Sequence, residues 1–284
     1  MPLAFTSVRS VQNENTLDFE MTSGHMKCKI CNGESVEQFT AKVLGKYDVR
    51  YYLCSRCSFL QTEDPYWLNE AYRNPINLTD TDVVNRSLFF SKIVTALICL
   101  HFEKSGRFLD YGGGYGLFTR LMRDVGFDYY LSDPITENLF ARGFDGTGHG
   151  KKFELITSFE TLEHFADPMK EIATMLELSS NIFFSTETLP IPVPSLADWY
   201  FYGPTHGQHV SFYSRRTFNT IAGLLHLNYY TNGTDLHFLT KTRMSPAGFR
   251  FIMRYGKLLY LILKKQMKTR TATDSVMLSN NSES

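Results

Sequence analysis

The chain has 284 residues, enough for one sizeable α/β domain with a small appendage or for two modest domains. Its 43% hydrophobic and 20% charged residues lie in the ordinary globular range. The 29 basic and 29 acidic residues cancel, which excludes a global positive field that would gather nucleic acid or anionic lipid and leaves only local patches.

The first 25 residues are polar and weakly patterned, and they predict a disordered leader. Met26 follows directly and is a candidate functional start. Residues 26–75 combine four cysteines with strand-like runs such as Tyr51-Tyr52-Leu53, and they predict a small module. No uninterrupted apolar run reaches the roughly 18–20 residues needed to span a bilayer, and no secretory signal is visible. We therefore expect a cytoplasmic protein.

Strand and helix patterns alternate from residue 82 to residue 242. Apolar residues at helical spacing predict a helix over 82–104, and Asp167-Pro168 predicts the start of another. Asn232-Gly233 predicts a hairpin within 228–242. Strands are also predicted at 107–111, 129–132, 153–159 and 181–186, and a helix at 215–225. This alternation predicts an α/β, Rossmann-like doubly wound sheet that ends in an antiparallel hairpin.

Residues 243–270 predict a basic amphipathic helix. No acidic residue occurs between Met244 and Asp274, and the cations within 246–268 are Arg250, Arg254, Lys257, Lys264, Lys265 and Lys268. Such a helix either lies peripherally on an anionic membrane, here the inner membrane surface, or docks on the domain through its apolar residues. The polar residues 271–284 predict a disordered tail.

Glycines cluster directly after the first strand of the alternating region. Gly112, Gly114 and Gly116 follow Asp110 at every second position. Glycine lets a ligand approach the main chain closely, and the helix that follows presents free N–H groups. In the dinucleotide-binding pattern the third glycine is spaced more widely from the second than it is here. Asp133 ends the next strand, about 20 residues further on, where a carboxylate can accept hydrogen bonds from ribose hydroxyls.

Three motifs stand in order: Asp110-x-Gly112-x-Gly114-x-Gly116, then Leu131-Ser-Asp133-Pro134, then the run 153–164 that contains Phe159 and Glu160. This set resembles that of class I S-adenosylmethionine-dependent methyltransferases and covers roughly residues 82–242. The resemblance implies that the glycines face the methionine part of the cofactor and that Asp133 binds its ribose. Phe159 and Glu160 would lie beside its adenosine and sulfonium. The alternatives are a NAD-binding domain and a non-catalytic scaffold of the same fold.

Four cysteines form two Cys-x-x-Cys pairs, Cys28/Cys31 and Cys54/Cys57. Two such pairs can offer four thiolates in a tetrahedron, the arrangement of a structural zinc site. Disulfides are disfavoured in a reducing cytoplasm, and a redox Cys-x-x-Cys is expected singly. The pattern therefore predicts a structural Zn²⁺ that is closed to substrate. Cys99, in an apolar stretch, is interpreted as a packing residue.

A four-cysteine module ahead of such a domain is similar to that of sugar C-methyltransferases, in which a Trp and a Tyr follow, as Trp67 and Tyr72 do here. That resemblance implies a small sugar or sugar-nucleotide acceptor, methylated on carbon or oxygen. Ribosomal RNA guanine methyltransferases also carry a zinc module, which helps to hold RNA. The zero net charge and the few cations near the cysteines argue against RNA as a partner. The oligomeric state is left open.

Methyl transfer to a hydroxyl or a carbon acid requires a base, and histidine suits this role because its unperturbed pKa is about 6.5. His206 and His209 lie in the aromatic loop 198–213, which follows a predicted strand at the carboxyl edge of the sheet. In similar methyltransferases a histidine at the position of His209 lies near the acceptor. We predict His209 as the base, with His164 and His206 as further candidates. The alternative is that His209 only orders the loop.

Glu160, Glu163 and His164 stand at i, i+3 and i+4, so one helical face could present all three. Quinone-pathway O-methyltransferases have a similar run and use it for a divalent cation. The same triplet also occurs widely in the superfamily without a metal. We favour a structural role, in which local hydrogen bonds order the start of a helix.

Overall fold

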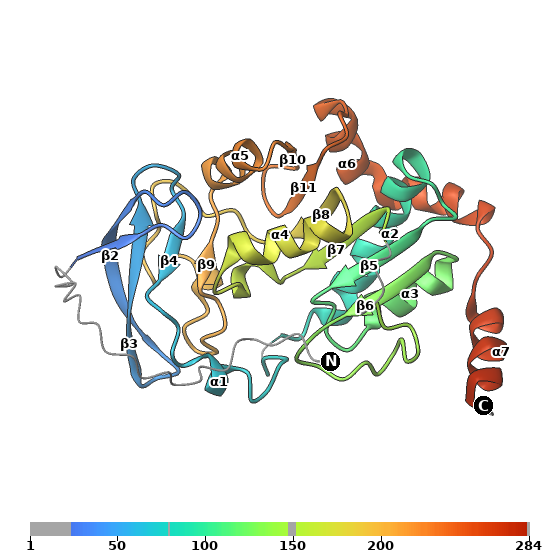
Figure 1. Cartoon of the computed structure of the whole chain (residues 1–284), viewed down its shortest axis with the longest axis horizontal. Coiled ribbons are helices and arrows are strands. Elements are labelled where there is room, and N and C mark those ends of the chain that lie inside the picture. The colour runs from blue at the N-terminus through green and yellow to red at the C-terminus, as the bar shows by residue number, and fades with distance from the viewer. Residues whose placement is uncertain (1–23, 79, 147–151, 283–284) are drawn as a thin grey trace.

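A computed structural model describes residues 24–78, 80–146 and 152–282 of the chain, and within them the strands form two sheets (Figure 1). The larger sheet runs in the order β10 (Asn228–Thr231), β11 (Leu236–Thr240), β8 (Asn181–Ser185), β7 (Leu155–Phe159), β5 (Arg107–Tyr111) and β6 (Asp128–Ser132). The smaller runs in the order β1 (His25–Lys27), β2 (Glu34–Val43), β3 (Tyr47–Cys54), β4 (Leu60–Thr62) and β9 (Ser211–Phe212). The predicted Rossmann-like α/β fold with an N-terminal cysteine module is confirmed.

The parallel strands of the larger sheet determine where the candidate functional residues lie. Strands β8, β7, β5 and β6 are parallel, and the antiparallel β10–β11 hairpin extends the sheet beside β8. Because parallel strands end at a common edge, the residues that follow them are brought together there. Gly112 follows β5, Asp133 follows β6, Glu160 follows β7 and Glu187 lies just beyond β8.

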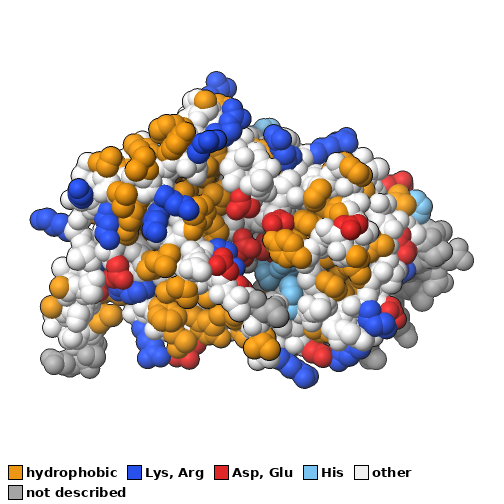
Figure 2. Space-filling view, turned by 180° about the vertical axis from the view of Figure 1, so that it is seen from behind, with side chains coloured by type: hydrophobic (Ala, Val, Ile, Leu, Met, Phe, Trp, Pro, Cys, Tyr) orange, Lys and Arg blue, Asp and Glu red, His pale blue; other side chains and the backbone are white. Residues whose placement is uncertain are grey.

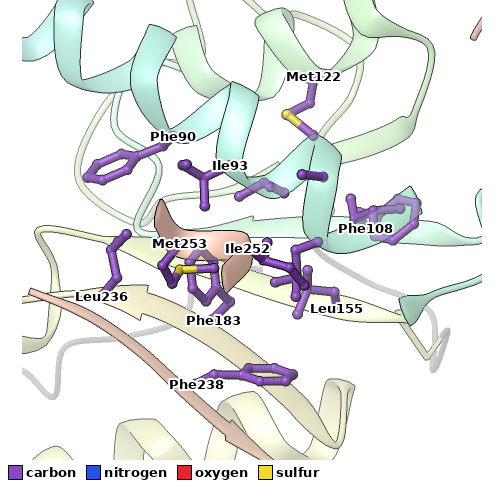
Figure 3. Packing of buried hydrophobic residues seen from close by; sticks show 14 of the residues in the cluster. Phe90, Ile93, Phe108, Met122, Leu155, Phe183, Leu236, Phe238, Ile252 and Met253 are labelled. Atoms are coloured by element: carbon purple, nitrogen blue, oxygen red, sulfur yellow. The ribbon is translucent and has the colours of Figure 1, made fainter. Parts of the chain in front are cut away.

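Helices cover both faces of the larger sheet, and successive strand residues point into two different cores: Phe108 lies in one and Leu109 in the other. One face carries α2 (Val83–His101), α3 (Leu117–Val125) and α6 (Pro246–Leu263), and the other carries α4 (Pro168–Leu178) and α5 (Arg215–Leu224). Figure 3 shows Ile93, Ile252 and Phe183 gathered in the first core. Burying each such side chain contributes about 1.5–3 kcal/mol.

Helix α2 has the length and hydropathy to cross a membrane, the one such helix in the described parts of the chain. In this fold 44% of its apolar window is buried. Residues 93–98 lie in the core, where α2 packs against α3 and α6. A core helix of this kind meets the same length and hydropathy criteria as a membrane span.

The smaller sheet is completed by a strand from far along the chain. β9 lies in the predicted aromatic loop, yet it pairs with β4 through Leu60↔Phe212 and Gln61↔Ser211. Trp67 also donates from Nε1 to the Gly207 carbonyl at 2.8 Å. The cysteine-containing segment and the aromatic loop therefore pack as one unit. A two-residue strand has no periodicity, so no pattern in the sequence predicts it.

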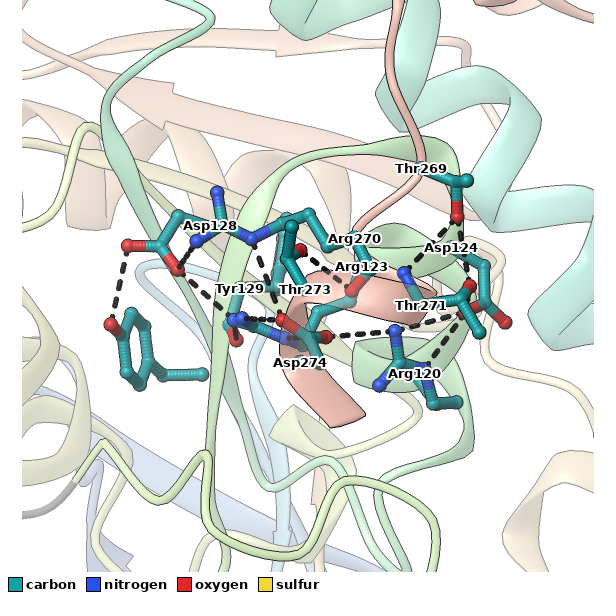
Figure 4. A network of polar contacts seen from close by, with 11 residues as sticks. Arg120, Arg123, Asp124, Asp128, Tyr129, Thr269, Arg270, Thr271, Thr273 and Asp274 are labelled. Carbon is teal, nitrogen blue, oxygen red and sulfur yellow. Dashed lines mark hydrogen bonds and ion pairs between the residues drawn. The ribbon is translucent and has the colours of Figure 1, made fainter. Parts of the chain in front are cut away.

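The tail beyond residue 270 is helical in the structure, so the prediction of disorder there was wrong up to residue 282. Helix α7 (Thr271–Ser282) begins at a buried ion pair, shown in Figure 4. Arg123, whose side chain is 1% exposed, donates to both carboxylate oxygens of Asp274 at 2.8 and 2.7 Å. Arg123 also pairs with Asp128 at 3.0 Å, so the two carboxylates together compensate its buried charge. The polar composition of the tail therefore gives no indication of the ion pair between Arg123 and Asp274.

The predicted leader is described only at its end. Residues 1–23 lie outside the described residues, as do 283 and 284 of the predicted tail. Strand β1 begins at His25, so the predicted leader extended one residue too far, and Met26 lies inside β1, paired with Ser35.

Candidate active site

A cleft of about 1620 Å³ opens where the parallel strands end. Its walls come from the loops after β5, β6 and β7, from residues 200–209, and from residues 72–90 at the start of α2. Figure 2 shows acidic and histidine side chains in a hollow of this face. Pockets for one small ligand occupy about 300–1,000 Å³, so the cleft has room for a cofactor and an acceptor together.

The glycine loop takes conformations that side chains rarely permit. Gly112, Gly114 and Gly116 have φ angles of 70°, 58° and 83°, in the left-handed region that glycine enters without cost. The N–H of Gly112 donates to the Ser132 carbonyl at 2.7 Å, which ties the loop to β6. A Cβ at Gly114 would meet no atom within 4 Å, because this residue faces the open cleft.

Two carboxylates fix this loop. Asp110 is 1% exposed and accepts hydrogen bonds from the hydroxyls of Thr119 and Thr157 at 3.3 and 3.1 Å. Burial raises its pKa to about 7. Asp133 accepts the N–H of Gly114 on Oδ2 at 2.9 Å and two further backbone N–H groups on Oδ1. Asp110 thus supports the loop from the core, whereas Asp133 stands at the cleft wall, where the sequence predicted a ribose contact.

Phe159 and Glu160 lie at the end of β7 and line the cleft. The Phe159 ring stacks on Phe90 with centroids 4.1 Å apart. Glu160 has a φ of 50°, a left-handed conformation that costs roughly 1–2 kcal/mol. Ser185 holds it there, because its Oγ accepts the Glu160 N–H at 2.9 Å and donates to Glu160 Oε1 at 2.5 Å. Burial raises the pKa of this carboxyl.

Glu160, Glu163 and His164 do not share one helical face, although their spacing would allow it. Glu160 is left-handed, and the short 3₁₀ turn η1 (Leu162–His164) replaces the expected α-helical start. The structure instead brings together Glu163, His164 and His209, whose ligand-type atoms all lie within 4.8 Å of one another. Glu163 is fully buried, and burial raises the pKa of its carboxyl well above the usual value.

Three histidines meet in the cleft. The rings of His164 and His209 lie 5.0 Å apart, and those of His206 and His209 lie 4.6 Å apart. His209 Nδ1 is 2.6 Å from the Phe201 carbonyl. Because a carbonyl only accepts, Nδ1 carries the proton and Nε2 the lone pair. Burial lowers the pKa of His164 to about 3, that of His209 well below its usual value, and that of His206 in the same direction. All three rings are therefore neutral at pH 7.

Three further polar residues line the cleft: Gln208, which lies in the predicted aromatic loop, and Tyr72 and Arg86, which sequence analysis missed. The Tyr72 hydroxyl lies 2.9 Å from His164 Nδ1. Gln208 donates from Nε2 to the backbone carbonyl just before Tyr72 at 3.0 Å. Arg86 donates to both carboxylate oxygens of Asp80 at 2.9 Å. Tyr72 belongs to the Trp–Tyr motif, and Arg86 is a charged residue in a largely apolar helix. Each feature can be recognised in the sequence, but neither indicates that the residue lines the cleft.

The four predicted metal-ligating cysteines meet away from the cleft. The Sγ atoms of Cys28 and Cys57 lie 3.5 Å apart, as do those of Cys31 and Cys54, and all four lie within 4.8 Å of one another. Zinc–sulfur bonds of about 2.3 Å place sulfurs about 3.8 Å apart in a tetrahedron, so the cluster suits a metal ion. Cys99, which lies in α2, instead packs against the core, as predicted.

Residues 85–229, just over half of the chain, match the family model described as a methyltransferase domain. The chain belongs to this methyltransferase family. With its glycine loop and Asp133, it is an S-adenosylmethionine-dependent methyltransferase, and the match sets aside the NAD-binding alternative. A search of curated proteins found no significant match.

Solved structures resemble this methyltransferase at low identity. The plantazolicin methyltransferase BpumL in complex with SAH is 14% identical over 71% of this chain and 84% of that chain, with a TM-score of 0.44. The 1,6-didemethyltoxoflavin-N1-methyltransferase of Burkholderia thailandensis is 12% identical over 69% and 96%, with a TM-score of 0.46. CalO1, a methyltransferase in calicheamicin biosynthesis, is 12% identical over 54% of each chain, with a TM-score of 0.39.

The residues present fit the cofactor. The open face of Gly114 leaves room for a ligand against the main chain, and Asp133 stands beside it with a carboxylate that can accept from ribose hydroxyls. The N-terminus of α3 follows at Gly116 and presents unpaired N–H groups. Phe159 and Glu160 border the same space. When bound, S-adenosylmethionine supplies an electrophilic methyl group on a sulfonium.

We expect Gly114→Ala to weaken cofactor binding far more than it weakens folding. The added methyl group enters the empty space of the cleft, so it meets the cofactor and not the protein. Calorimetry with S-adenosylhomocysteine should show a loss in affinity of about tenfold or more. Gly45→Ala is the matched control, because Gly45 has a φ of 71° and equally open surroundings but lies outside the cleft. Equal affinities for the two variants would contradict this placement of the cofactor.

Proposed function

We propose that this methyltransferase methylates a small, uncharged, sugar-like acceptor on a hydroxyl or a carbon acid, and that His209 takes the proton. The observation that carries the proposal is the combination of neutral histidines and carboxylates at the end of the cleft beyond the cofactor loop. We call this part the acceptor end. It is lined by Asp80, Arg86, Glu160, His164, Glu187, Tyr200, Phe201, His206, Gln208, His209 and Asp235.

The charge of the acceptor end favours a neutral ligand. Four carboxylates line it, but Asp80 is paired with the arginine there, Arg86, and burial raises the pKa of Glu160. The carboxylates of Glu187 and Asp235 form no ion pair with the described residues, so their charge is not compensated. Carboxylates in a partly buried site repel phosphate, whereas they accept hydrogen bonds from sugar hydroxyls. This supports a sugar whose bound part carries no phosphate over the nucleotide part of a sugar nucleotide.

The hydrogen bonds of His209 suit it to act as a base. Its Nδ1–H is committed to the Phe201 carbonyl, so Nε2 keeps a lone pair that can accept a proton from the acceptor. His164 lies next to it and is held by Tyr72. Neutral neighbours place no fixed positive charge beside the proton that His209 receives. Gln208, pinned to the segment before Tyr72, keeps this loop against the cleft wall.

One alternative acceptor remains distinct from this proposal. An RNA methyltransferase would use the cysteine module to hold RNA, but the carboxylates of the acceptor end work against a phosphate backbone. The family match sets aside the non-catalytic scaffold.

The acceptor class can be assayed by transfer of labelled methyl from S-adenosylmethionine into a panel of free sugars, glycosides, sugar nucleotides and RNA. We expect the highest kcat/KM with acceptors that carry no phosphate, because phosphate is repelled at the acceptor end. A preference for RNA that falls steeply with salt would establish the RNA alternative instead. A preference for sugar nucleotides over the matching glycosides would contradict the charge argument.

Replacing the base should slow the chemistry without loosening the cofactor. We expect His209→Ala to lower kcat by about 10²–10⁴-fold, the usual contribution of a general base, and to leave affinity for S-adenosylhomocysteine unchanged. Because burial lowers the pKa of His209 well below 6.5, the wild-type rate should stay level as the pH falls from 8 to 6.5 and decline only in more acidic buffer. His101→Ala, at the exposed end of α2, is the control. Full activity of His209→Ala would remove this residue from the mechanism.

We further propose that the four cysteines hold one structural Zn²⁺. Four thiolates with no open position suit zinc in a folding role. The cluster also touches the domain that carries the active site, because the hydroxyls of Ser214 and Thr217 at the start of α5 donate to the Cys57 carbonyl at 3.4 and 3.0 Å. The ion would therefore stabilise the contact between the smaller sheet and the aromatic loop.

Metal analysis of the purified protein should find one zinc ion per chain. We expect Cys28→Ser to lose the ion and to unfold at lower temperature, since metal binding and folding are coupled. Cys99→Ser should keep the metal, because Cys99 packs away from the cluster. Purified wild-type protein that contains no zinc, together with a Cys28→Ser variant that is as stable as the wild type, would overturn the proposal.

A further inference from the structure

Helix α6 is apolar on two sides. Its inner side buries Phe249, Ile252, Met253 and Gly256 against the core and α2. Its outer side leaves five large apolar residues 42–62% exposed: Phe251, Tyr255, Leu258, Leu261 and Ile262. A surface helix normally turns polar residues outward, and a cluster of exposed apolar side chains marks a surface that contacts something else.

The outer side is also strongly basic. Arg250, Arg254, Lys257, Lys264, Lys265 and Lys268 lie on or just beyond α6, and no acidic residue separates them. No ion pair joins any of these six to a residue in the described ranges. Lys257 and Lys264 instead lie over the rings of Phe89 and Tyr260. Figure 2 shows Lys and Arg side chains interleaved with hydrophobic ones over this side of the molecule, next to the hollow.

The positive charge of the outer face of α6 decides which of the possible partners it can bind. A second copy of the chain, docked by the same face, would bring six unpaired cations against six others, and like charges in contact disfavour such an interface. An anionic lipid surface matches both features. Apolar side chains enter the boundary between headgroups and acyl chains, and the flanking cations reach the lipid phosphates.

We propose that the outer face of α6 docks this methyltransferase on an anionic phospholipid bilayer. The helix lies in the plane of the interface and does not cross it, since its inner side stays packed on the protein. Lys257, on the flank of α6 over the Phe89 ring, also lines the cleft, so the docked protein holds the cleft next to the membrane surface. This inference does not depend on the proposed acceptor.

The full-length protein should be tested by flotation with two kinds of vesicle, phosphatidylcholine alone and phosphatidylcholine mixed with phosphatidylglycerol. We expect binding to the anionic vesicles to be at least about tenfold tighter, and to weaken as salt is raised. Leu258→Ser/Ile262→Ser should lower that binding about tenfold or more by removing inserted apolar area. Lys264→Glu/Lys265→Glu should do the same through charge and should reduce the salt dependence, since four of the six cations remain.

Matched controls lie on other surfaces. Leu224→Ser changes a residue of α5 that is 51% exposed, and Lys241→Glu changes an exposed cation after β11; both should bind like the wild type. All substituted side chains point outward, so unfolding in urea should be nearly unchanged and will show that the variants are folded. No binding to anionic vesicles, or equal binding by all four variants, would overturn the proposal. A dimer in sedimentation that Leu258→Ser/Ile262→Ser abolishes would assign the face to a second copy.

Discussion

The active site depends on the pairing of β4 with β9. This short antiparallel contact carries the aromatic loop from the carboxyl edge of the larger sheet to the edge of the smaller one. Hydrogen bonds within the loop and just after it support it: Trp67 donates to the Gly207 carbonyl, and Thr217 in the first turn of α5 donates to the Cys57 carbonyl. His209 is held between these anchors, two residues before β9. The cysteine cluster is therefore remote from the cleft and still determines where the histidine loop lies.

The same arrangement explains the electrostatics of the cleft. Tyr72, His164 and His209 come from three distant parts of the chain and close around one another, which removes water from the rings. Loss of water penalises a charged imidazole, so the pKa values of both histidines fall and the rings stay neutral. Burial has the opposite effect on the carboxyl groups of Glu160 and Glu163, whose pKa values rise. The fold thus reduces the charge of its own site before any ligand enters.

How much the sequence could predict depends on how far apart in the chain the interacting residues lie. Strands of the parallel sheet and the glycine loop are encoded locally, by apolar runs and by glycines at Gly112, Gly114 and Gly116, and the structure has them where they were expected. Strand β9, the contact of Tyr72 with His164 and the start of α7 at Asp274 each depend on a partner far away in sequence. No local pattern marks them. Glu160 was misassigned for a related reason, since its left-handed backbone is held by Ser185 from the neighbouring strand.

The net charge of zero conceals a separation of charge that only the fold reveals. Acidic side chains gather at the acceptor end of the cleft, whereas unpaired cations gather on the outer face of α6. Lys257 of α6 lines the same cleft, so the two regions lie on neighbouring parts of the molecule. Averaged over the chain, the negative and positive charges cancel, and the net charge suggests a protein that does not bind charged surfaces. Separated in space, they give it a cleft that disfavours anions beside a surface that attracts them, so a neutral acceptor and an anionic membrane are compatible demands on one molecule.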